Sequence, residues 1–368
     1  MEKFFVPGRT ELAGNHTDHQ NGRVLAGAID LGLRAKVSAV PGGVISVRAA
    51  GQEPFELRTN QLAVRPLEFG TPRAMTRGVL AAFADMGLQI GGFDATVTST
   101  LPVGAGLSSS AAFAVLIARI LSRLYNQDQV DPVVLAKAAH AAENKHFGKP
   151  SGLMSQLVCA LGKTVYIDLK TMEIEPVPAD FAAMGLTLCL TETGGSHAGL
   201  DTSYARIPAD MVYVANLFDK GVLADVDPAA FRAKGWDPAN RPVRRAMHFF
   251  DENERVPQMR DALKAGDGKT YMRLMNESGR SSEKLLNNIV TSVTGDTKLA
   301  SGLDLSRKLL EGKGAWRVHG GGFAGCVQAL MPSELFPAYK QAMEESFGEG
   351  SCREISLLGT APRGGALR

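Results

Sequence analysis

The chain has 368 residues, of which 45% are hydrophobic and 21% are charged. This composition is typical of a soluble globular protein, and the length gives room for two domains. The 40 lysines and arginines nearly balance 38 aspartates and glutamates, which leaves a formal net charge of +2. Because no basic block stands out, the composition gives no case for binding nucleic acid or a membrane surface.

The cysteines and the N-terminal segment bear on the compartment. Cys159, Cys189, Cys326 and Cys352 lie far apart without metal-ligand spacing, which predicts reduced thiols. The opening MEKFFVPGRTELAG has no signal-peptide core, and no apolar run approaches bilayer length. We therefore expect a cytoplasmic protein. The sequence does not define an oligomeric state and is compatible with a monomer.

Strand-like and helix-like segments alternate along the chain, which predicts an α/β or α+β architecture. Strands are predicted over 24–38, 43–48, 93–100, 163–169, 185–193, 324–331 and 352–358. Helices are predicted over 109–125, 132–147, 208–224, 250–265, 268–287 and 333–347. A hairpin over 164–178 would lead into a boundary near 175–185, which divides the chain into domains 1–180 and 181–368. The region 225–245, rich in Pro, Gly and Asp, is predicted to be a surface connection.

The first segment with chemical character is PGRTELAGNHTDHQNG, Pro7 to Gly22. Its density of short polar side chains between two strand-like runs is poor core material. It suits a loop that hydrogen-bonds a polyhydroxylated ligand, because each hydroxyl both donates and accepts. Asp18 would accept such bonds, and His16 would donate or accept. The alternative is a solvated polar turn.

The second segment is LPVGAGLSSSAAF, Leu101 to Phe113, where a strand leads through a glycine-rich turn into a helix. A helix N-terminus offers unpaired amides and partial positive charge, which together suit a phosphate. Gly104 and Gly106 permit positive φ and close backbone approach. The serines add hydroxyl donors and one ligand for Mg²⁺. The alternative is a tight turn with a serine N-cap.

The third segment is RVHGGGFAGCVQAL, Arg317 to Leu330. Three consecutive glycines carry a large entropy cost on folding, which predicts close backbone approach to a ligand or to the phosphate loop. A hairpin turn is the alternative, but it leaves the third glycine unexplained. His319, just before the glycines, is predicted to be packed rather than catalytic.

Together these segments resemble the GHMP small-molecule kinases, and among them the galactokinases. GRTELAGNHTDH matches the sugar motif, GAGLSSSAA at Gly104 to Ala112 matches the phosphate loop, and GGGFAG at Gly320 to Gly325 matches the third motif. ENERV (252–256), LMNES (274–278) and PRGGA (362–366) also look like galactokinase. The resemblance therefore runs the whole length of the chain, with its three main motifs in the family's order.

The resemblance implies an α+β, two-domain GHMP kinase fold. It consists of a ribosomal-S5-like N-terminal domain and a ferredoxin-like C-terminal domain, with the active site in the cleft between them. It implies ATP- and Mg²⁺-dependent phosphorylation of a hexose, galactose first among them, at the anomeric 1-OH. The partners would be this sugar and ATP.

The resemblance also implies site residues. The nucleotide would be held by Gly104, Ala105, Gly106, Leu107, Ser108, Ser109 and Ser110, with Gly321 and Gly322. Ser110 and Glu143 would hold Mg²⁺. Glu11, Asn15, His16, Thr17, Asp18, Gly152 and Tyr204 would bind the sugar, with Arg9 and Ser155 at the catalytic positions.

Ser155 departs from the family pattern, because active galactokinases carry an aspartate in a GxMDQ motif where this chain has PSGLMSQ. That aspartate is thought to accept the proton of the sugar 1-OH, and a serine near neutral pH is neither a base nor an anion. Turnover would slow while binding persists. The rival interpretation is a sugar- and nucleotide-binding sensor. A kinase for another substrate such as mevalonate is a third, which the polar loop at 15–20 disfavours.

A second departure exchanges an acid and an amide. The family's Asn and Glu in NLIGEH are here Glu11 and Asn15, four residues apart. If the two side chains lie together, the acceptor has moved within one site, and the recognised hydroxyl would change.

Overall fold

The computed structural model describes residues 1–102, 106–195, 199–291 and 293–359. The described residues form two compact units. Unit 1 holds residues 1–10, 28–102 and 107–163, and unit 2 holds the remainder, including 11–27 and 106. Residues 164–180, which the sequence assigned to the first domain, pack with unit 2. The domain limits 1–180 and 181–368 stay a prediction.

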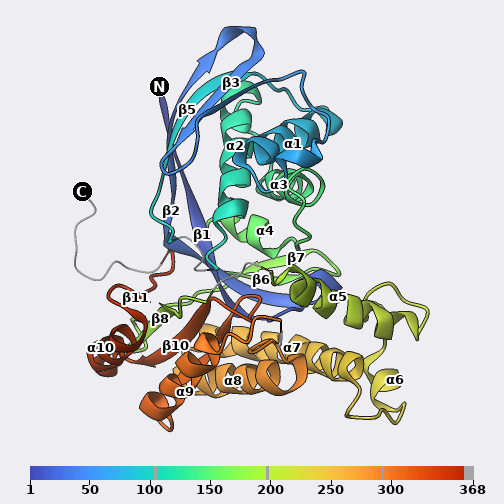
Figure 1. Ribbon diagram of the computed structural model, residues 1–368, viewed down its shortest axis with the longest axis vertical. Coiled ribbons are helices and arrows are strands. Elements are labelled where there is room, and N and C mark those ends of the chain that lie inside the picture. The colour runs from blue at the N-terminus through green and yellow to red at the C-terminus, as the bar shows by residue number, and fades with distance from the viewer. Residues whose placement is uncertain (103–105, 196–198, 292, 360–368) are drawn as a thin grey trace. The chain divides into compact units, whose positions relative to one another are not determined.

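Unit 1 combines a sheet with four helices. Its strands are β1 (Glu2–Ala13), β2 (Arg23–Val40), β3 (Val44–Ala49), β4 (Phe55–Arg58) and β5 (Gly92–Ser99), and both β1 and β2 continue into unit 2. The strand order is β4-β3-β5-β2, β1 pairs with β2, and β3 and β5 run parallel. The helices are α1 (Pro72–Asp85), α2 (Ser109–Tyr125), α3 (Pro132–Lys145) and α4 (Met154–Leu161), which pack against one another beside the sheet (Figure 1).

Unit 2 contains a second sheet and the remaining helices. Strands β6 (Val165–Asp168) and β7 (Glu173–Pro176) extend the first sheet beyond β2, and the second sheet consists of β8 (Leu186–Glu192), β9 (Ala315–His319), β10 (Cys326–Pro332) and β11 (Cys352–Glu354). The helices of unit 2 are α5 (Asp201–Asn216), α6 (Pro228–Arg232), α7 (Arg241–Lys264), α8 (Gly268–Ser281), α9 (Lys298–Leu310) and α10 (Phe336–Phe347). Short 3₁₀ turns lie at Asp18–Gln20, Pro41–Gly43, Pro66–Glu68, Leu223–Asp225 and Ser333–Leu335, and a π-turn at Ser282–Leu286.

The sheet of β8 to β11 has ferredoxin-like topology. Its strand order is β11-β8-β10-β9, which is fourth, first, third and second along the chain, and every neighbouring pair is antiparallel. Helices connect β8 to β9, and α10 connects β10 to β11 (Figure 1). This β-α-β-β-α-β order is the C-terminal fold that the resemblance implied. The predicted hairpin is also present, since β6 pairs antiparallel with β7.

The structure corrects two predicted segments of unit 2. The helix predicted over 208–224 begins at Asp201 and ends at Asn216, with Pro208 inside it. Buried side chains at Ile207 and Met211 hold the helix on both sides of the proline, so packing outweighs the lost hydrogen bond. The segment 225–245, predicted to be a surface connection, contains α6 and the start of α7. Helix α6 is anchored by Phe231, which is buried in one apolar cluster with Ile207 and Met211.

Several elements had no counterpart among the predicted ones: α1, α4, α6, α9, β1, β4 and β9. Helix α1 contains Gly78, which lowers helix propensity. A Cβ at Gly78 would come within 2.7 Å of the Cα of Ala142, so close packing of α1 on α3 requires the glycine. Helix α2, by contrast, is apolar on nearly every face and matches its predicted bounds.

Two further observations concern the cysteines and membranes. All four cysteines are buried and free, in keeping with the prediction of reduced thiols. Across the part of the chain that the structure describes, no helix has both the length and the apolar character needed to cross a bilayer.

Candidate active site

The predicted site residues divide between the two units. Unit 1 contains Arg9, Leu107, Ser108, Ser109, Ser110, Glu143, Gly152 and Ser155. Unit 2 contains Glu11, Asn15, His16, Thr17, Asp18, Gly106, Tyr204, Gly321 and Gly322. Gly104 and Ala105 lie outside the described residues. Each group is described by itself below.

The start of α2 presents the geometry of an anion site. Ser108 is the N-cap residue, with a left-handed φ of 63°, and its side chain does not cap the helix. Its hydroxyl instead donates to Ser155 Oγ at 3.0 Å. Ser109 and Ser110 form the first turn of α2. Because the Ser108 hydroxyl does not cap this turn, the amides of the turn are available to other acceptors. The carbonyl of Leu107 accepts from the amide of Arg9 at 3.2 Å, which ties this turn to β1.

Arg9 converges on the same serine. Its Nε and Nη2 donate to Ser155 Oγ at 3.1 and 2.9 Å. Ser155 lies in the first turn of α4, so α2, α4 and β1 bring Ser108, Ser155 and Arg9 together within unit 1. A guanidinium fork fits the two oxygens of a carboxylate, but here both nitrogens bind one neutral oxygen. Gly152 lies three residues before Ser155, on the segment that leads into α4.

Glu143 forms the acidic part of the unit 1 site. It is buried on α3, and its Oε1 accepts from Ser110 Oγ at 2.7 Å. Its Oε2 accepts from Gln156 Nε2 and, at 3.5 Å, from Ser151 Oγ, while Lys149 Nζ lies 3.4 Å from Oε1. A hydroxyl beside a carboxylate is the oxygen donor set that Mg²⁺ prefers. No cluster of three or more His, Cys, Asp or Glu that could hold a metal occurs in the described ranges.

The polar loop of unit 2 is tightly turned. Gly14 has a φ of +95°, and a Cβ there would lie 2.6 Å from the carbonyl oxygen of Arg23. Thr17 is fully buried, and its hydroxyl is 2.8 and 2.6 Å from the carbonyls of Gly14 and Arg23. Thr17 therefore closes the loop from inside. Asp18 begins the 3₁₀ turn and accepts from the amide of His19 at 2.9 Å.

Two histidines of the loop form a directed hydrogen-bond chain. His16 Nε2 lies 3.0 Å from the Gly321 carbonyl oxygen, which accepts only, so this nitrogen carries the proton. His16 Nδ1 then accepts from His19 Nε2 at 3.2 Å, and His19 Nδ1 accepts from Gln20 Nε2 at 3.3 Å. The hydrogen-bond network thus assigns one tautomer to each ring. His16 also has a φ of 58°, which is uncommon for a residue other than glycine.

Burial keeps these histidines neutral. Burial, with a smaller contribution from the neighbouring His19, lowers the pKa of His16 to about 3. Burial likewise lowers the pKa of His19, against the opposing effect of Asp18, and the pKa of His248 on α7, against that of Glu252. All three imidazoles protonate more readily in the unfolded chain than in the folded one.

Lowering the pH is therefore expected to destabilise unit 2 already at pH values well above those at which its carboxylates protonate. Below pH 6.5, and down to about pH 3 at His16, the unfolded chain binds more protons at these histidines than the folded chain, so stability falls as the pH falls. The free energy of unfolding, measured by urea titration, should decrease between pH 7 and pH 5. Glu252, whose pKa is lowered to about 2, adds its loss only below its ordinary value of 4.5. A constant free energy between pH 7 and pH 5 would contradict this expectation.

The exchanged acid and amide do lie together. Asn15 Nδ2 donates to Glu11 Oε1 at 3.3 Å and to the Gly320 carbonyl at 2.7 Å. Asn15 Oδ1 accepts from Ser282 Oγ at 3.1 Å and from Asn288 Nδ2 at 3.3 Å. Protein groups thus fill the hydrogen-bonding sites of the Asn15 amide. The Glu11 carboxylate is buried and pairs with Arg317 at 3.2 Å. The role of Glu11 and Asn15 in sugar binding stays a prediction.

Close approach of the triple glycine to a ligand or to the phosphate loop stays a prediction, but within unit 2 two of its glycines lie very close to other protein groups. A Cβ at Gly322 would lie 2.0 Å from the Asn288 carbonyl oxygen, and one at Gly321 would lie 2.8 Å from the Tyr204 ring. The Tyr204 hydroxyl donates to the Gly322 carbonyl at 2.8 Å. These contacts explain the third glycine, which a hairpin turn did not.

His319 is packed, as predicted. It is 3% exposed, and its Nε2 accepts from the amide of Glu11 at 3.3 Å. A Cβ at Gly106 would lie 3.3 Å from His319 Nδ1, so the phosphate-loop glycine of unit 2 lies beside this histidine. A small side chain at 106 thus allows the two segments to meet.

Sequence reasoning assigned no role to three buried residues of unit 2 that contact the polar loop or its partners: His248 and Glu252 on α7 and Ser278 on α8. A signal was available for Glu252. It lies three residues after Phe249 and four before Val256, which are both fully buried, so helical spacing places a carboxylate on an apolar face. Such a group needs partners.

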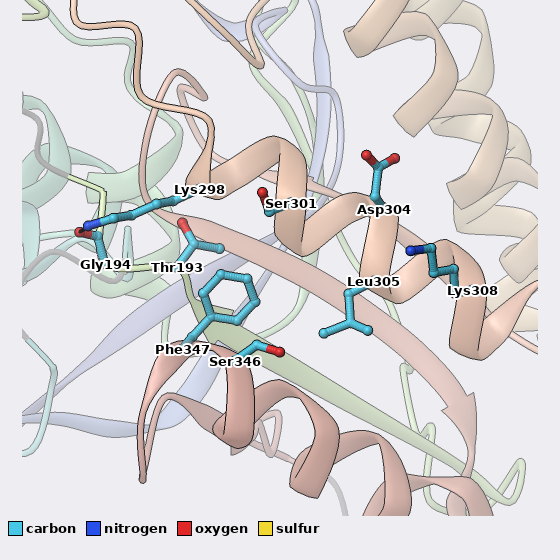
Figure 2. Close-up of a pocket in the computed structure, with 9 residues that line it drawn as sticks. All are labelled: Thr193, Gly194, Lys298, Ser301, Asp304, Leu305, Lys308, Ser346 and Phe347. Atoms are coloured by element: carbon cyan, nitrogen blue, oxygen red, sulfur yellow. Dashed lines mark hydrogen bonds between the residues drawn. The ribbon is translucent and has the colours of Figure 1, made fainter.

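A separate hollow of about 670 Å³ lies on unit 2 (Figure 2). Lys298, Ser301 and Leu305 line it from α9, and Phe347 lines it from the end of α10. The Lys298 Nζ donates to the Gly194 carbonyl at 3.1 Å, and Asp304 pairs with Arg307. The hollow includes none of the predicted site residues.

Comparisons with known proteins identify the family. The family model "GHMP kinases N terminal domain" matches residues 74–163, and the "Galactokinase galactose-binding signature" matches residues 3–39. The chain is 30% identical to a galactokinase of Streptomyces coelicolor over 375 aligned positions, covering 99% of this chain and 93% of that protein. The chain belongs to the galactokinase family.

Solved structures agree with a galactokinase-family fold. The galactokinase of Lactococcus lactis, solved with galactose, superposes with a TM-score of 0.85 at 21% identity, covering 97% of this chain and 93% of that one. A mevalonate kinase superposes with a TM-score of 0.69 at 16% identity, covering 97% and 99%. The predicted α+β GHMP kinase fold is therefore confirmed. As a member of this kinase family, the chain is a sugar kinase by descent, and the family uses ATP as phosphoryl donor.

Proposed function

We propose that this galactokinase-family protein binds galactose and ATP and transfers the γ-phosphoryl group to the anomeric 1-OH, with turnover limited by Ser155. The single observation that carries the proposal is the convergence of Arg9, Ser108 and Ser155 at the start of α2. A guanidinium, a helix N-terminus and a hydroxyl pair at this point suit a transferring phosphoryl group.

The chain itself links Arg9 to the sugar motif. Arg9 and Glu11 are separated by one residue of β1, so their Cα atoms are at most about 7 Å apart. Asn15 to Asp18 follow directly on the same segment. We therefore assign the sugar to the polar loop of unit 2 and the transferred group to the Arg9 side of β1.

Mg²⁺ is part of the proposal. Ser110 Oγ and the buried Glu143 carboxylate fit the ion, since both are hard oxygen donors 2.7 Å apart. Bound there, Mg²⁺ would neutralise charge on the phosphates. Gln156, Ser151 and Lys149 fix the Glu143 carboxylate in place, so little reorganisation would be needed on binding.

In the transfer step the 1-OH oxygen forms a bond to the γ-phosphorus, the bond to ADP breaks, and the hydroxyl proton must leave. Ser155 is neutral and cannot accept this proton, so we assign it to solvent water. Because the transition state of phosphoryl transfer is loose, the proton can leave after the bond to ADP has lengthened. Arg9 stabilises the charge on the transferring group.

A second candidate function is a sugar and nucleotide sensor with little or no transfer. Ser155 favours it, because binding needs the phosphate loop and the polar loop but not a base. We place either activity in the cytoplasm, where the four free cysteines remain reduced.

Calorimetry and an ATP-consumption assay distinguish these functions. The unmodified chain is titrated with ATP in the presence of Mg²⁺ and with galactose, glucose and mevalonate, and ADP release is then followed with each acceptor. We expect binding of galactose and ATP together with slow, galactose-dependent ADP release. Binding without release would support the sensor, and folded protein that binds neither ligand would refute both functions.

A further inference from the structure

Four buried side chains of unit 2 form a closed ring with Asn15 of the polar loop, which takes part through both its backbone amide and its side chain; the links are hydrogen bonds and one ion pair. We call it the Glu252 ring; its members are Glu11, Asn15, Glu252, Ser278 and Arg317. Glu252 Oε1 accepts from the backbone N–H of Asn15 at 3.4 Å and from Ser278 Oγ at 2.7 Å. Ser278 Oγ in turn accepts from Arg317 Nη1 at 3.3 Å. Arg317 Nη2 lies 3.2 Å from Glu11 Oε1, which also accepts from Asn15 Nδ2 at 3.3 Å.

The ring is buried, and both of its carboxylates are paired with arginines. Each of its five residues is less than 5% exposed. Glu11 pairs with Arg317, and Glu252 pairs with Arg255 on the next turn of α7. Burial alone would raise the pKa of Glu252, but Arg255, His248 and Arg317 outweigh burial and lower it to about 2. The carboxylate is therefore ionised at neutral pH, and its bonds to the loop amides are charge-assisted.

The Glu252 ring binds the backbone of the polar loop as well as the Asn15 side chain. Glu252 Oε1 accepts from the amide of Gly14 at 3.1 Å as well as from that of Asn15. On the other side, His248 Nε2 donates to the Asn15 carbonyl at 2.8 Å, and the Ser281 hydroxyl lies 2.8 Å from His248 Nδ1. The peptide groups before and after Asn15 are thus held from α7.

The next residue is His16, in the left-handed conformation. Such a conformation in a non-glycine residue persists only where the surroundings enforce it. The neighbouring Gly14 also has positive φ, so Asn15, where the ring binds, lies between two residues with positive φ. Loss of the ring would let this stretch relax to ordinary backbone angles.

We propose that Glu252 and Ser278 are positioning residues for sugar recognition, which hold residues 14–16 in their strained conformation before the sugar arrives. The inference rests on the proposed function for its ligand. Neither side chain needs to touch the sugar. A loop that is already ordered loses less conformational entropy on binding, so the ring would act on affinity.

The test compares Ser278→Ala and Glu252→Gln with Glu254→Gln, an exposed acid on the same helix, as control. Ser278→Ala removes two links of the ring. Glu252→Gln keeps an oxygen acceptor for the two amides, so it should retain more affinity than Glu252→Ala. We expect Ser278→Ala to weaken galactose binding about tenfold by calorimetry, with ATP affinity unchanged. Glu254→Gln should leave both affinities unchanged.

A second measurement does not need the sugar. Hydrogen–deuterium exchange of the Gly14 and Asn15 amides should accelerate in Ser278→Ala, while the Arg23 amide, held by Asn253 at 2.6 Å, should keep its rate. Folded variants with unaltered exchange and unaltered galactose affinity would overturn the positioning role. Unmodified protein that binds ATP but no galactose would instead overturn the proposed function, and with it the role assigned here. If Glu252→Ala does not fold, Ser278→Ala decides alone.

Discussion

Replacement of Ser155 by aspartate is expected to raise the turnover of galactose phosphorylation at least about tenfold, and a general base typically contributes about 100- to 10,000-fold. Arg9 Nε and Nη2 already converge on Ser155 Oγ, and Ser108 donates to the same atom. A carboxylate would give the guanidinium two oxygens in place of one and would be ionised at neutral pH. It would then accept the proton of the 1-OH.

The measurement is the steady-state rate of ADP release with galactose, beside the galactose affinity by calorimetry. Ser155→Asn is the matched control, because it supplies similar size and an acceptor oxygen but no basic group. A gain in Ser155→Asp alone, at unchanged affinity, identifies a missing base. Equal rates in all three proteins would mean that the proton leaves by another route and that Ser155 does not limit turnover.

Replacement of Glu143 by glutamine is expected to abolish the benefit that Mg²⁺ gives to ATP binding and to lower turnover by about 100-fold or more. The amide is nearly isosteric, but it carries no charge for a divalent cation. The amide oxygen can still accept from Ser110 in place of Oε1, which keeps α3 tied to the start of α2, while the NH₂ group in place of Oε2 loses the bonds from Gln156 and Ser151. ATP titrations with and without Mg²⁺ measure the effect directly, without depending on the low turnover of the unmodified chain.

Asp128→Asn serves as the control for Glu143→Gln, since it removes an exposed acid of the same unit. It should leave the Mg²⁺ dependence of ATP binding unaltered. If Glu143→Gln also binds ATP with full Mg²⁺ dependence, Glu143 is a structural acid that orders Ser110, and the metal is held elsewhere.

The sequence was sufficient where one local signal defined the structure of an element. The apolar run after Ser108 predicted the bounds of α2, and the serines at its start lie in its first turn. The contact between Ser110 and Glu143 followed from the resemblance alone, because a pair 33 residues apart leaves no local signal. Local reading also failed at Pro208, which looks like a helix start although the buried Ile207 and Met211 continue the helix around it.

The Glu252 ring could not be read from the sequence for a related reason. Its members come from β1, α7, α8 and β9, together with the polar loop, and no spacing rule connects these elements. The motifs ENERV and LMNES contain Glu252 and Ser278, but the resemblance to galactokinases assigned no role to either residue. The triple glycine could be singled out from the sequence, because three consecutive glycines are unusual in themselves. Its close neighbour Asn288, 34 residues away from Gly322, could not.

Protein groups occupy every hydrogen-bonding position of the Asn15 side-chain amide, which limits the substitutions that residues 11 and 15 can tolerate one at a time. Relatives resembling the NLIGEH pattern carry the acid at 15 and the amide at 11, so passage between the two arrangements requires two changes. An intermediate with acids at both positions places a second carboxylate against Glu11 Oε1 and the Gly320 carbonyl, with Arg317 as the cation nearby. An intermediate with amides at both leaves Arg317 buried without its acid. Each single exchange is therefore expected to be less stable than the arrangement found in this chain.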